Sequence, residues 1–473
     1  MNKPYLAKVA VALTLLASSP ASFAGALDFY YQDHLLRASS LTSLKSNIKT
    51  NYFNQLVDHK RPALGFFSQR YYLDDQYATS SDAPVFFYIC GESVCRPQAL
   101  SGEIREMAKK YHARLIALEH RYYGESLPRP SFSTSDLQYL TTDLALKDLA
   151  VFQQAMSESH HWTGKWVTFG GSYPGSLSAY YRLRYPELAV GALASSAPVQ
   201  AKDNFEEYDA HVTKVAGPRC AEQMREAYRE IEAAVTDSSR MTQIKRSFGV
   251  EALKDNTDFL FFVADIGSAA VQYGYKQKFC NMLAEGSSSL AGFADFSQYL
   301  YQAWGIENPM SLAMQGAESE NPGDYADGLG MRQWYYQSCT EYGYWQGAHH
   351  DPEKSTRSSW VSTDYFHEAC HRLFGIDVPA NTESINERFY QPLQNESASR
   401  IFFTNGSNDP WSLLSLSATN GNASNANLTY YTIDGAAHCG DLHASRENDS
   451  AALKRARQQL SGLLSAWLAT TDQ

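Results

Sequence analysis

The sequence is poor in positive charge and has no long apolar run beyond its first residues. It holds 40 Lys and Arg against 51 Asp and Glu, which gives a net charge of -11, and the basic residues form no cluster. An acidic surface repels phosphate backbones, so nucleic acid is not expected as a partner. A membrane-spanning helix needs about 20 predominantly apolar residues. No segment after residue 24 approaches that length, so stable membrane insertion is not expected either.

Residues 1–24 have the features of an export signal. Lys3 and Lys8 supply a positively charged start, and residues 9–17 form a short apolar stretch. Ser22-Phe23-Ala24 then places small residues at the positions that a signal peptidase inspects. The apolar stretch is too short to span a bilayer alone, although an uncleaved anchor is the alternative. We therefore expect a secreted or periplasmic protein whose mature chain begins near Gly25.

Cysteine is scarce, with seven residues, and the number is odd. In an exported protein these residues are expected to form structural disulfides rather than redox-active pairs. An odd count leaves at least one thiol unpaired within the chain. Spacing alone does not decide which cysteines pair, although Cys370 is a candidate partner of Cys339.

The chain of 473 residues is longer than one ordinary core requires, and its pattern changes twice. Apolar strand-like runs alternate with helical periodicity in the first half, which predicts a parallel α/β sheet covered on both faces. Helical periodicity and aromatic residues then dominate before strand-like runs return. The strand-like runs are residues 85–89, 114–118, 166–169, 190–194, 401–404 and 428–433. We expect one α/β core, residues 25–200 and 380–473, interrupted by a mostly helical insertion, residues 201–379.

A serine flanked by glycines follows the third strand-like run. The segment Gly170-Gly171-Ser172-Tyr173 lies between a predicted strand and a predicted helix. A nucleophilic serine of an α/β-hydrolase projects from a sharp strand-to-helix turn, where small neighbours avoid clashes. Pro174 replaces the usual second glycine, and proline is acceptable in the first turn of a helix. Ser172 is therefore the predicted nucleophile; an ordinary glycine-rich loop is the alternative.

A serine nucleophile needs a base, and the last two strand-like runs are each followed by a suitable residue. Asp409 follows the first of them and His438 follows the second. The order Ser, Asp, His is the one that α/β-hydrolases use. His438 is expected to take the proton of Ser172, and Asp409 is expected to orient the imidazole. Asp441 and His443 are the nearest rivals.

Two backbone N–H groups are needed to hold the oxyanion that forms during acyl transfer. The residue after the nucleophile, Tyr173, is expected to supply one of them. The other should come from the loop after residues 85–89, where Gly91 allows the backbone to approach a substrate closely. A plain turn is the alternative explanation of Gly91.

A second catalytic motif competes with the serine. His367-Glu368-Ala369-Cys370-His371 matches the H-E-x-x-H pattern of zinc peptidases. Short motifs also arise by chance, and the sequence shows no clear third ligand. We therefore expect no metal and no other cofactor.

Several segments in a fixed order resemble one family of enzymes. The chain is similar to the lysosomal Pro-X carboxypeptidase and dipeptidyl-peptidase II family of serine peptidases. The matching segments include Glu119-His120-Arg121-Tyr122-Tyr123-Gly124-Glu125-Ser126, Gly170-Gly171-Ser172-Tyr173, Gln337-Ser338-Cys339-Thr340-Glu341, Asp409-Pro410-Trp411 and Ala437-His438. The resemblance implies an α/β-hydrolase fold with an inserted helical cap, cleavage beside proline, and a triad at Ser172, Asp409 and His438. Pro174, Ser176 and Cys90 depart from the family pattern, and a local Cys90–Cys95 bridge would reshape the entrance to the site.

The expected substrates are peptides, and the resemblance suggests where they bind. Trp411 is placed to form part of an apolar pocket for proline; a core tryptophan is the alternative. Glu92 and Glu341 are candidates for binding a substrate's α-ammonium group, the alternative being pairing with Arg121 or Arg332. We expect an exopeptidase that releases N-terminal dipeptides. The alternatives are a Pro-X carboxypeptidase, a prolyl endopeptidase, an esterase, the zinc peptidase and an inactive binding protein. The sequence does not decide whether the protein forms a homodimer.

Overall fold

The computed structural model describes residues 48–325, 330–418 and 424–470. The expected export signal, residues 1–24, lies outside the described residues, so its cleavage stays a prediction. No helix of the described chain is long and apolar enough to cross a membrane.

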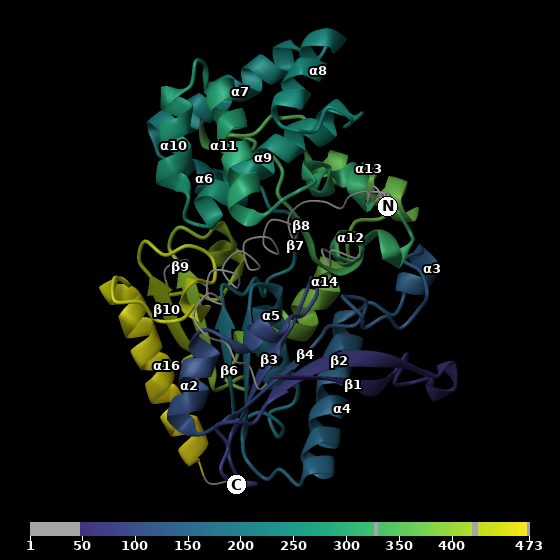
Figure 1. Cartoon of the computed structure of the whole chain (residues 1–473), viewed down its shortest axis with the longest axis vertical. Coiled ribbons are helices and arrows are strands. Elements are labelled where there is room, and N and C mark those ends of the chain that lie inside the picture. Colours follow the sequence, from purple (N-terminus) through teal and green to yellow (C-terminus); the bar gives the residue numbers. More distant parts are fainter. Residues whose placement is uncertain (1–47, 326–329, 419–423, 471–473) are drawn as a thin grey trace, which may run out of the picture.

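An eight-stranded sheet forms the centre of the lower part of the molecule in Figure 1. Its spatial order is β1-β2-β4-β3-β5-β6-β9-β10. β1 and β2 form an antiparallel hairpin at one edge, β2 pairs antiparallel with β4, and the pairing is parallel from β4 to β10. The strands are β1 (Lys49–Leu56), β2 (Phe66–Asp74), β3 (Val85–Ile89), β4 (Arg114–Leu118), β5 (Trp166–Gly171), β6 (Gly191–Ser195), β9 (Ile401–Gly406) and β10 (Thr429–Ile433).

Helices cover both faces of this sheet because its central strands are apolar on both sides. On one face, Phe86 and Phe169 pack with side chains of α2 (Glu103–Tyr111) and α16 (Ala451–Ala469). On the other face, Phe87 and Leu118 share a core with α4 (Thr142–His160) and α5 (Tyr173–Arg184). Figure 1 shows α2 beside α16 and α4 on the opposite side. This is the predicted α/β-hydrolase fold.

The chain between β6 and β9 is mostly helical and forms a cap above the sheet (Figure 1). Its longest apolar helix, α9, is buried along nearly its whole length. A short parallel pair, β7 (Lys202–Asn204) and β8 (Gly343–Trp345), lies between the cap and the core. The helices are α6 (Glu207–Ala216), α7 (Pro218–Ala233), α8 (Ser238–Ser247), α9 (Asn256–Gln272), α10 (Lys276–Glu285), α11 (Ser289–Trp304), α12 (Met331–Gln337), α13 (Thr363–Phe374), α14 (Thr382–Ile385) and α15 (Gln391–Leu393); α3 (Thr134–Leu137) precedes the cap. The domain boundaries at residues 200 and 379 stay predictions.

Six of the seven cysteines form three disulfides. Cys90 bonds Cys95 in the loop after β3. Cys339, just after α12, bonds Cys370 in α13. The third bridge, Cys220–Cys280, ties α7 to α10 within the cap. The remaining thiol, Cys439, is buried. Both suggested pairings are therefore confirmed.

Candidate active site

Ser172 occupies the sharp turn between β5 and α5. Its φ of 61° lies in the left-handed region, which L-residues seldom adopt. Hydrogen bonds on both sides hold the turn, because the Ser172 N–H donates to Ser195 O (2.9 Å) and the Ser176 N–H donates to Ser172 O (3.1 Å). A Cβ on Gly170 would lie 2.1 Å from the Pro174 oxygen, so only glycine fits there. The turn leaves Ser172 partly exposed between buried neighbours.

Asp409 and His438 form a buried hydrogen-bonded pair. Asp409 follows β9 and His438 follows β10, and His438 Nδ1 lies 2.8 Å from Asp409 Oδ2. Asp409 Oδ1 also accepts the Trp411 N–H (3.0 Å), which fixes the carboxylate. Burial alone would lower the pKa of His438, but the charge of Asp409 outweighs it, with a further contribution from Cys439, and raises that pKa well above its ordinary value. His438 Nε2 is buried and has no hydrogen-bond partner in the described chain, so it remains available to a hydroxyl.

The loop that carries His438 touches both the serine turn and the cap. The Cys439 N–H donates to Ser196 Oγ (2.9 Å), just after β6. A Cβ on Gly171 would lie 2.8 Å from Cys439 Sγ, which shows how closely the loop packs on the residue before Ser172. From the cap, the Gln272 carbonyl accepts the His438 N–H (2.9 Å). Core and cap thus fix the position of the histidine together.

The two rivals of the predicted pair have other roles in the structure. The Asp441 carboxylate accepts the hydroxyl groups of Ser195 (2.5 Å) and Thr404 (2.7 Å), which links β6 to β9. His443 is half-buried beside Arg446 and Arg457, and desolvation of its imidazole lowers its pKa to about 4. Asp441 therefore joins the strands below the site.

Gly91 lies directly against the first turn of α5. A Cβ at this position would stand 2.3 Å from Pro174 Cγ and 3.3 Å from Tyr173 Cδ1. Carbon atoms in contact lie about 3.5–4.0 Å apart, so only glycine permits this approach. The backbones of the two residues expected to form the oxyanion hole, Gly91 and Tyr173, are therefore neighbours at the serine turn.

The Tyr173 ring is fixed by a network that sequence analysis did not identify. Its hydroxyl lies 3.1 Å from His120 Nε2 and accepts the Gln337 side-chain N–H (2.9 Å), while Tyr123 donates to Gln337 Oε1 (2.7 Å). Burial lowers the pKa of His120 to about 4, so its imidazole is neutral at pH 7. Since Nδ1 faces the Arg121 carbonyl (2.7 Å), it carries the proton and Nε2 accepts from Tyr173. His120 lies in one of the segments that match the family, Glu119 to Ser126, and that match was the available clue.

Of the two expected ammonium ligands, Glu341 already has partners. Its carboxylate accepts the N–H (3.0 Å) and hydroxyl (2.8 Å) of Thr142 at the start of α4. Burial raises the pKa of Glu341 to about 7. Glu92 is 7% exposed, close to Gly91 in the chain. The partner of Glu341 is therefore Thr142 and neither Arg121 nor Arg332.

Those arginines hold other parts of the chain. Arg121 forms a bidentate pair with Asp148 (2.6 and 2.7 Å). Arg332 donates mainly to backbone carbonyls, including those of Phe132 (2.8 Å) and Leu373 (2.9 Å). Both guanidinium groups are therefore structural.

Trp411 joins the aspartate loop to the aromatic residues of the cap. Its ring centroid lies 5.5 Å from Phe205, 5.6 Å from Tyr208 and 5.4 Å from Tyr344. It also borders two cavities. The first has a mainly aromatic lining of Phe261, Trp334, Tyr335, Ser338, Tyr344, Trp345, Gln346, Phe366 and Trp411.

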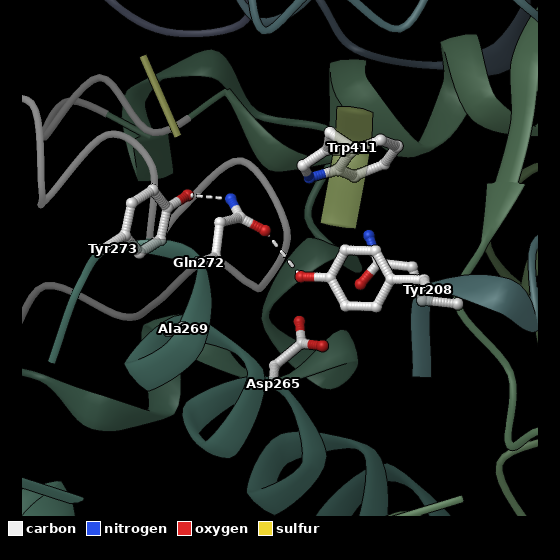
Figure 2. Close-up of a pocket in the computed structure, with 7 residues that line it drawn as sticks. Tyr208, Asp265, Ala269, Gln272, Tyr273 and Trp411 are labelled. Atoms are coloured by element: carbon white, nitrogen blue, oxygen red, sulfur yellow. Dashed lines mark hydrogen bonds between the residues drawn. The ribbon is translucent and has the colours of Figure 1, made fainter. Parts of the chain in front are cut away.

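The second cavity is polar and lies where α9 meets Trp411 (Figure 2). Tyr208 donates to Gln272 Oε1 (2.6 Å), and Gln272 Nε2 donates to Tyr273 (2.6 Å), which forms a chain along one wall. Asp265 points into the space between these side chains. Apart from Trp411, the residues that line this cavity were not predicted as part of the site.

The H-E-x-x-H histidines bind separate aspartates. His367 Nε2 lies 2.9 Å from Asp203, and His371 Nδ1 lies 2.6 Å from Asp377. The His/Cys/Asp/Glu group whose ligand atoms come close together in the described chain is Glu206, His349 and His350, and it contains neither motif histidine. The zinc-peptidase interpretation therefore gains no support from this geometry.

Comparison with known proteins identifies the family of the chain. Residues 55–460 match the family described as serine carboxypeptidase S28. The chain is 36% identical to a serine protease named EDA2 from Arabidopsis thaliana, over 76% of this chain and 74% of that protein. It is 30% identical to the mouse thymus-specific serine protease (85% and 84% covered) and 29% identical to the bovine lysosomal Pro-X carboxypeptidase (80% and 79% covered). The chain belongs to the S28 family of serine peptidases, and it is a serine-type peptidase.

Proposed function

We propose that this peptidase cleaves peptides beside proline through a triad of Ser172, His438 and Asp409, and that it releases N-terminal dipeptides. The observation that carries the triad is the buried His438–Asp409 pair: its Nε2 has no hydrogen-bond partner among the described residues and lies in a loop packed on the serine turn. A hydroxyl becomes nucleophilic only beside such a base.

The proposed reaction proceeds through an acyl-enzyme. His438 Nε2 takes the Ser172 proton while Oγ attacks the carbonyl carbon, and the Asp409 carboxylate stabilises the imidazolium. The oxyanion lies against the N–H groups of Tyr173 and Gly91. His438 then gives the proton to the departing amine. Water then attacks the acyl carbon while His438 takes its proton; the bond to Ser172 Oγ breaks, the peptide acid leaves, and His438 returns the proton to Ser172.

The preference for proline rests on the aromatic residues around the triad. Trp411 is two residues from Asp409 and packs on Tyr208 and Tyr344. A pyrrolidine ring packs well on such surfaces, and a relative is named a Pro-X carboxypeptidase. Three disulfides suit an oxidising compartment, so we place the protein outside the cytoplasm, secreted or periplasmic.

A panel of matched substrates tests this function. We expect cleavage of Ala-Pro-aminocoumarin amide, weak cleavage of its N-acetylated form and of Ala-Ala-aminocoumarin amide, and no release of the last residue from a benzyloxycarbonyl-Pro-Phe peptide. Efficient cleavage of that last substrate would instead favour the carboxypeptidase. Cleavage of simple esters alone would favour an esterase.

A further inference from the structure

The polar cavity in Figure 2 adjoins the proposed triad on the histidine side. Two residues of its wall contact the triad through their backbones: the Trp411 backbone N–H donates to Asp409 Oδ1, and the Gln272 backbone carbonyl accepts the His438 backbone N–H. The ring of Tyr273 lies 6.1 Å from that of His438, nearly perpendicular to it. The cavity has room for about one water molecule.

A carboxylate faces this cavity, and one of its oxygens has no hydrogen-bond partner among the described residues. Asp265, on α9, is 4% exposed, and its Oδ1 accepts no hydrogen bond from any described residue. Its nearest cation is Arg357, whose Nη2 is 3.7 Å away, beyond hydrogen-bonding distance. A carboxylate oxygen that accepts no hydrogen bond is costly to bury, and burial raises the pKa of Asp265 to about 7 despite the opposing charge of Arg357.

Arg357 does not belong to Asp265 alone. Its Nε lies 4.0 Å from Asp209, and its other nitrogens donate to Ser268 Oγ (2.6 Å) and to the Gln346 carbonyl. Asp209 is fully bonded: it accepts from the His349 N–H, the Ser355 hydroxyl, and the N–H and hydroxyl of Thr356. Two buried carboxylates thus share one guanidinium, and the cluster lacks one positive charge beside the cavity.

We propose that this cavity binds the α-ammonium group of the substrate, with Asp265 as its counter-ion. An ammonium group is about the size of the water molecule that the cavity accommodates, whereas a guanidinium is larger. The ring of Trp411 offers a cation–π surface, and the Tyr208 and Gln272 oxygens are further acceptors. The charge of a bound ammonium would balance the cluster.

The position of the cavity agrees with release of a dipeptide, and the inference rests on the function proposed above. The polar and aromatic cavities share Trp411 and Gln346 in their walls. A proline against the aromatic side of Trp411 therefore has its preceding residue, which carries the α-amine, within reach of Asp265. Asp265 takes the role expected of Glu341, whose oxygens are bonded to Thr142.

The neutral, isosteric variant Asp265→Asn tests the proposal. In the unmodified protein we expect kcat/KM to be about 10- to 100-fold higher for Ala-Pro-aminocoumarin amide than for its N-acetylated form. Asp265→Asn should lower the first value by that factor, chiefly through KM, and leave the second unchanged. Asp258→Asn is the matched control, because Asp258 is also a buried acid of α9 but bonds Tyr365 (2.7 Å) and does not line the cavity.

Two results with this pair of substrates would overturn the proposal. The preference for the free amine could survive in Asp265→Asn, or both substrates could lose activity equally while Asp258→Asn keeps it, which would make Asp265 structural. A third substrate, Nα-acetyl-Lys-Pro-aminocoumarin amide, separates the two sources of ammonium. If its cleavage falls in Asp265→Asn, the cavity binds a side chain and the α-ammonium assignment is wrong.

A binding measurement separates failure of this site from failure of the proposed function. Ala-Pro should slow labelling of the protein by a fluorophosphonate, N-acetyl-Ala-Pro should not, and the protection should disappear in Asp265→Asn. This readout needs no turnover of proline substrates. Equal protection by both dipeptides in the unmodified protein would contradict the ammonium site even if the triad is active.

Discussion

Replacement of Gly91 by alanine is expected to damage catalysis without unfolding the protein. The new Cβ would stand 2.3 Å from Pro174 Cγ and 2.6 Å from Pro174 Cδ. Carbon atoms in contact need about 3.5 Å, so the two segments must separate by about 1 Å. The proline ring cannot rotate away, because it forms part of the first turn of α5.

The separation acts on the two N–H groups proposed to bind the oxyanion. Tyr173 is joined to Pro174, and Gly91 lies in a loop closed by the Cys90–Cys95 disulfide, so neither donor moves independently. A misplacement of about 1 Å costs on the order of 100-fold in rate, and loss of one oxyanion donor costs about 100- to 1,000-fold. We expect kcat to fall by that range, about 3–4 kcal/mol in activation free energy, with a smaller change in KM.

The assay compares kcat for Ala-Pro-aminocoumarin amide, the rate of fluorophosphonate labelling and the melting temperature. Gly462→Ala is the control, since nothing lies within 4 Å of its Cβ position on α16. This control should keep full activity and gain slightly in stability. If folded Gly91→Ala retains kcat within threefold of the unmodified protein, the proposed oxyanion hole is wrong.

Three further predictions concern the base, a buried acid and the zinc motif. Asp409→Asn should lower kcat by about 10,000-fold and shift the acidic limb of the kcat/KM profile to lower pH, because the carboxylate no longer raises the pKa of His438; an unchanged profile would contradict this. Burial raises the pKa of Glu341 to about 7, so its contribution to the free energy of unfolding is present below pH 4.5 and is lost as the pH rises to 7. The free energy of unfolding, measured by urea titration, should fall between pH 4.5 and 7 by up to about 1.4 kcal/mol per pH unit in the unmodified protein and not in Glu341→Gln. The same pH dependence in both proteins would contradict this. Chelators and His367→Ala should leave peptidase activity within about twofold, since the motif histidines bind aspartates; loss of activity on chelation would revive the zinc mechanism.

Local patterns in the sequence predicted the core elements well. The runs at 85–89 and 114–118 are β3 and β4 residue for residue. These elements are recognisable because each is apolar enough to be buried whatever its neighbours are. The β1–β2 hairpin was not predicted, since its polar residues give a weaker pattern.

The subsites could not be predicted in the same way because they depend on contacts distant in sequence. Asp265 lies in an apolar helix. It can bind a further cation because Arg357, 92 positions later in the chain, lies near both Asp265 and Asp209. Glu341 is an acid of the expected type, but its carboxylate already accepts hydrogen bonds from Thr142. Sequence reasoning identifies an acid of the right type, whereas its availability depends on how its neighbours pack.

Identification of the residue that reacts with a fluorophosphonate tests the central claim most directly. The protein is labelled and digested, and the adduct is located by mass spectrometry. We expect one adduct, on Ser172, and no labelling of Ser172→Ala, whose kcat should fall by about a million-fold while its melting temperature is unchanged. An adduct on another serine, or peptidase activity that persists in folded Ser172→Ala, would contradict the proposed triad.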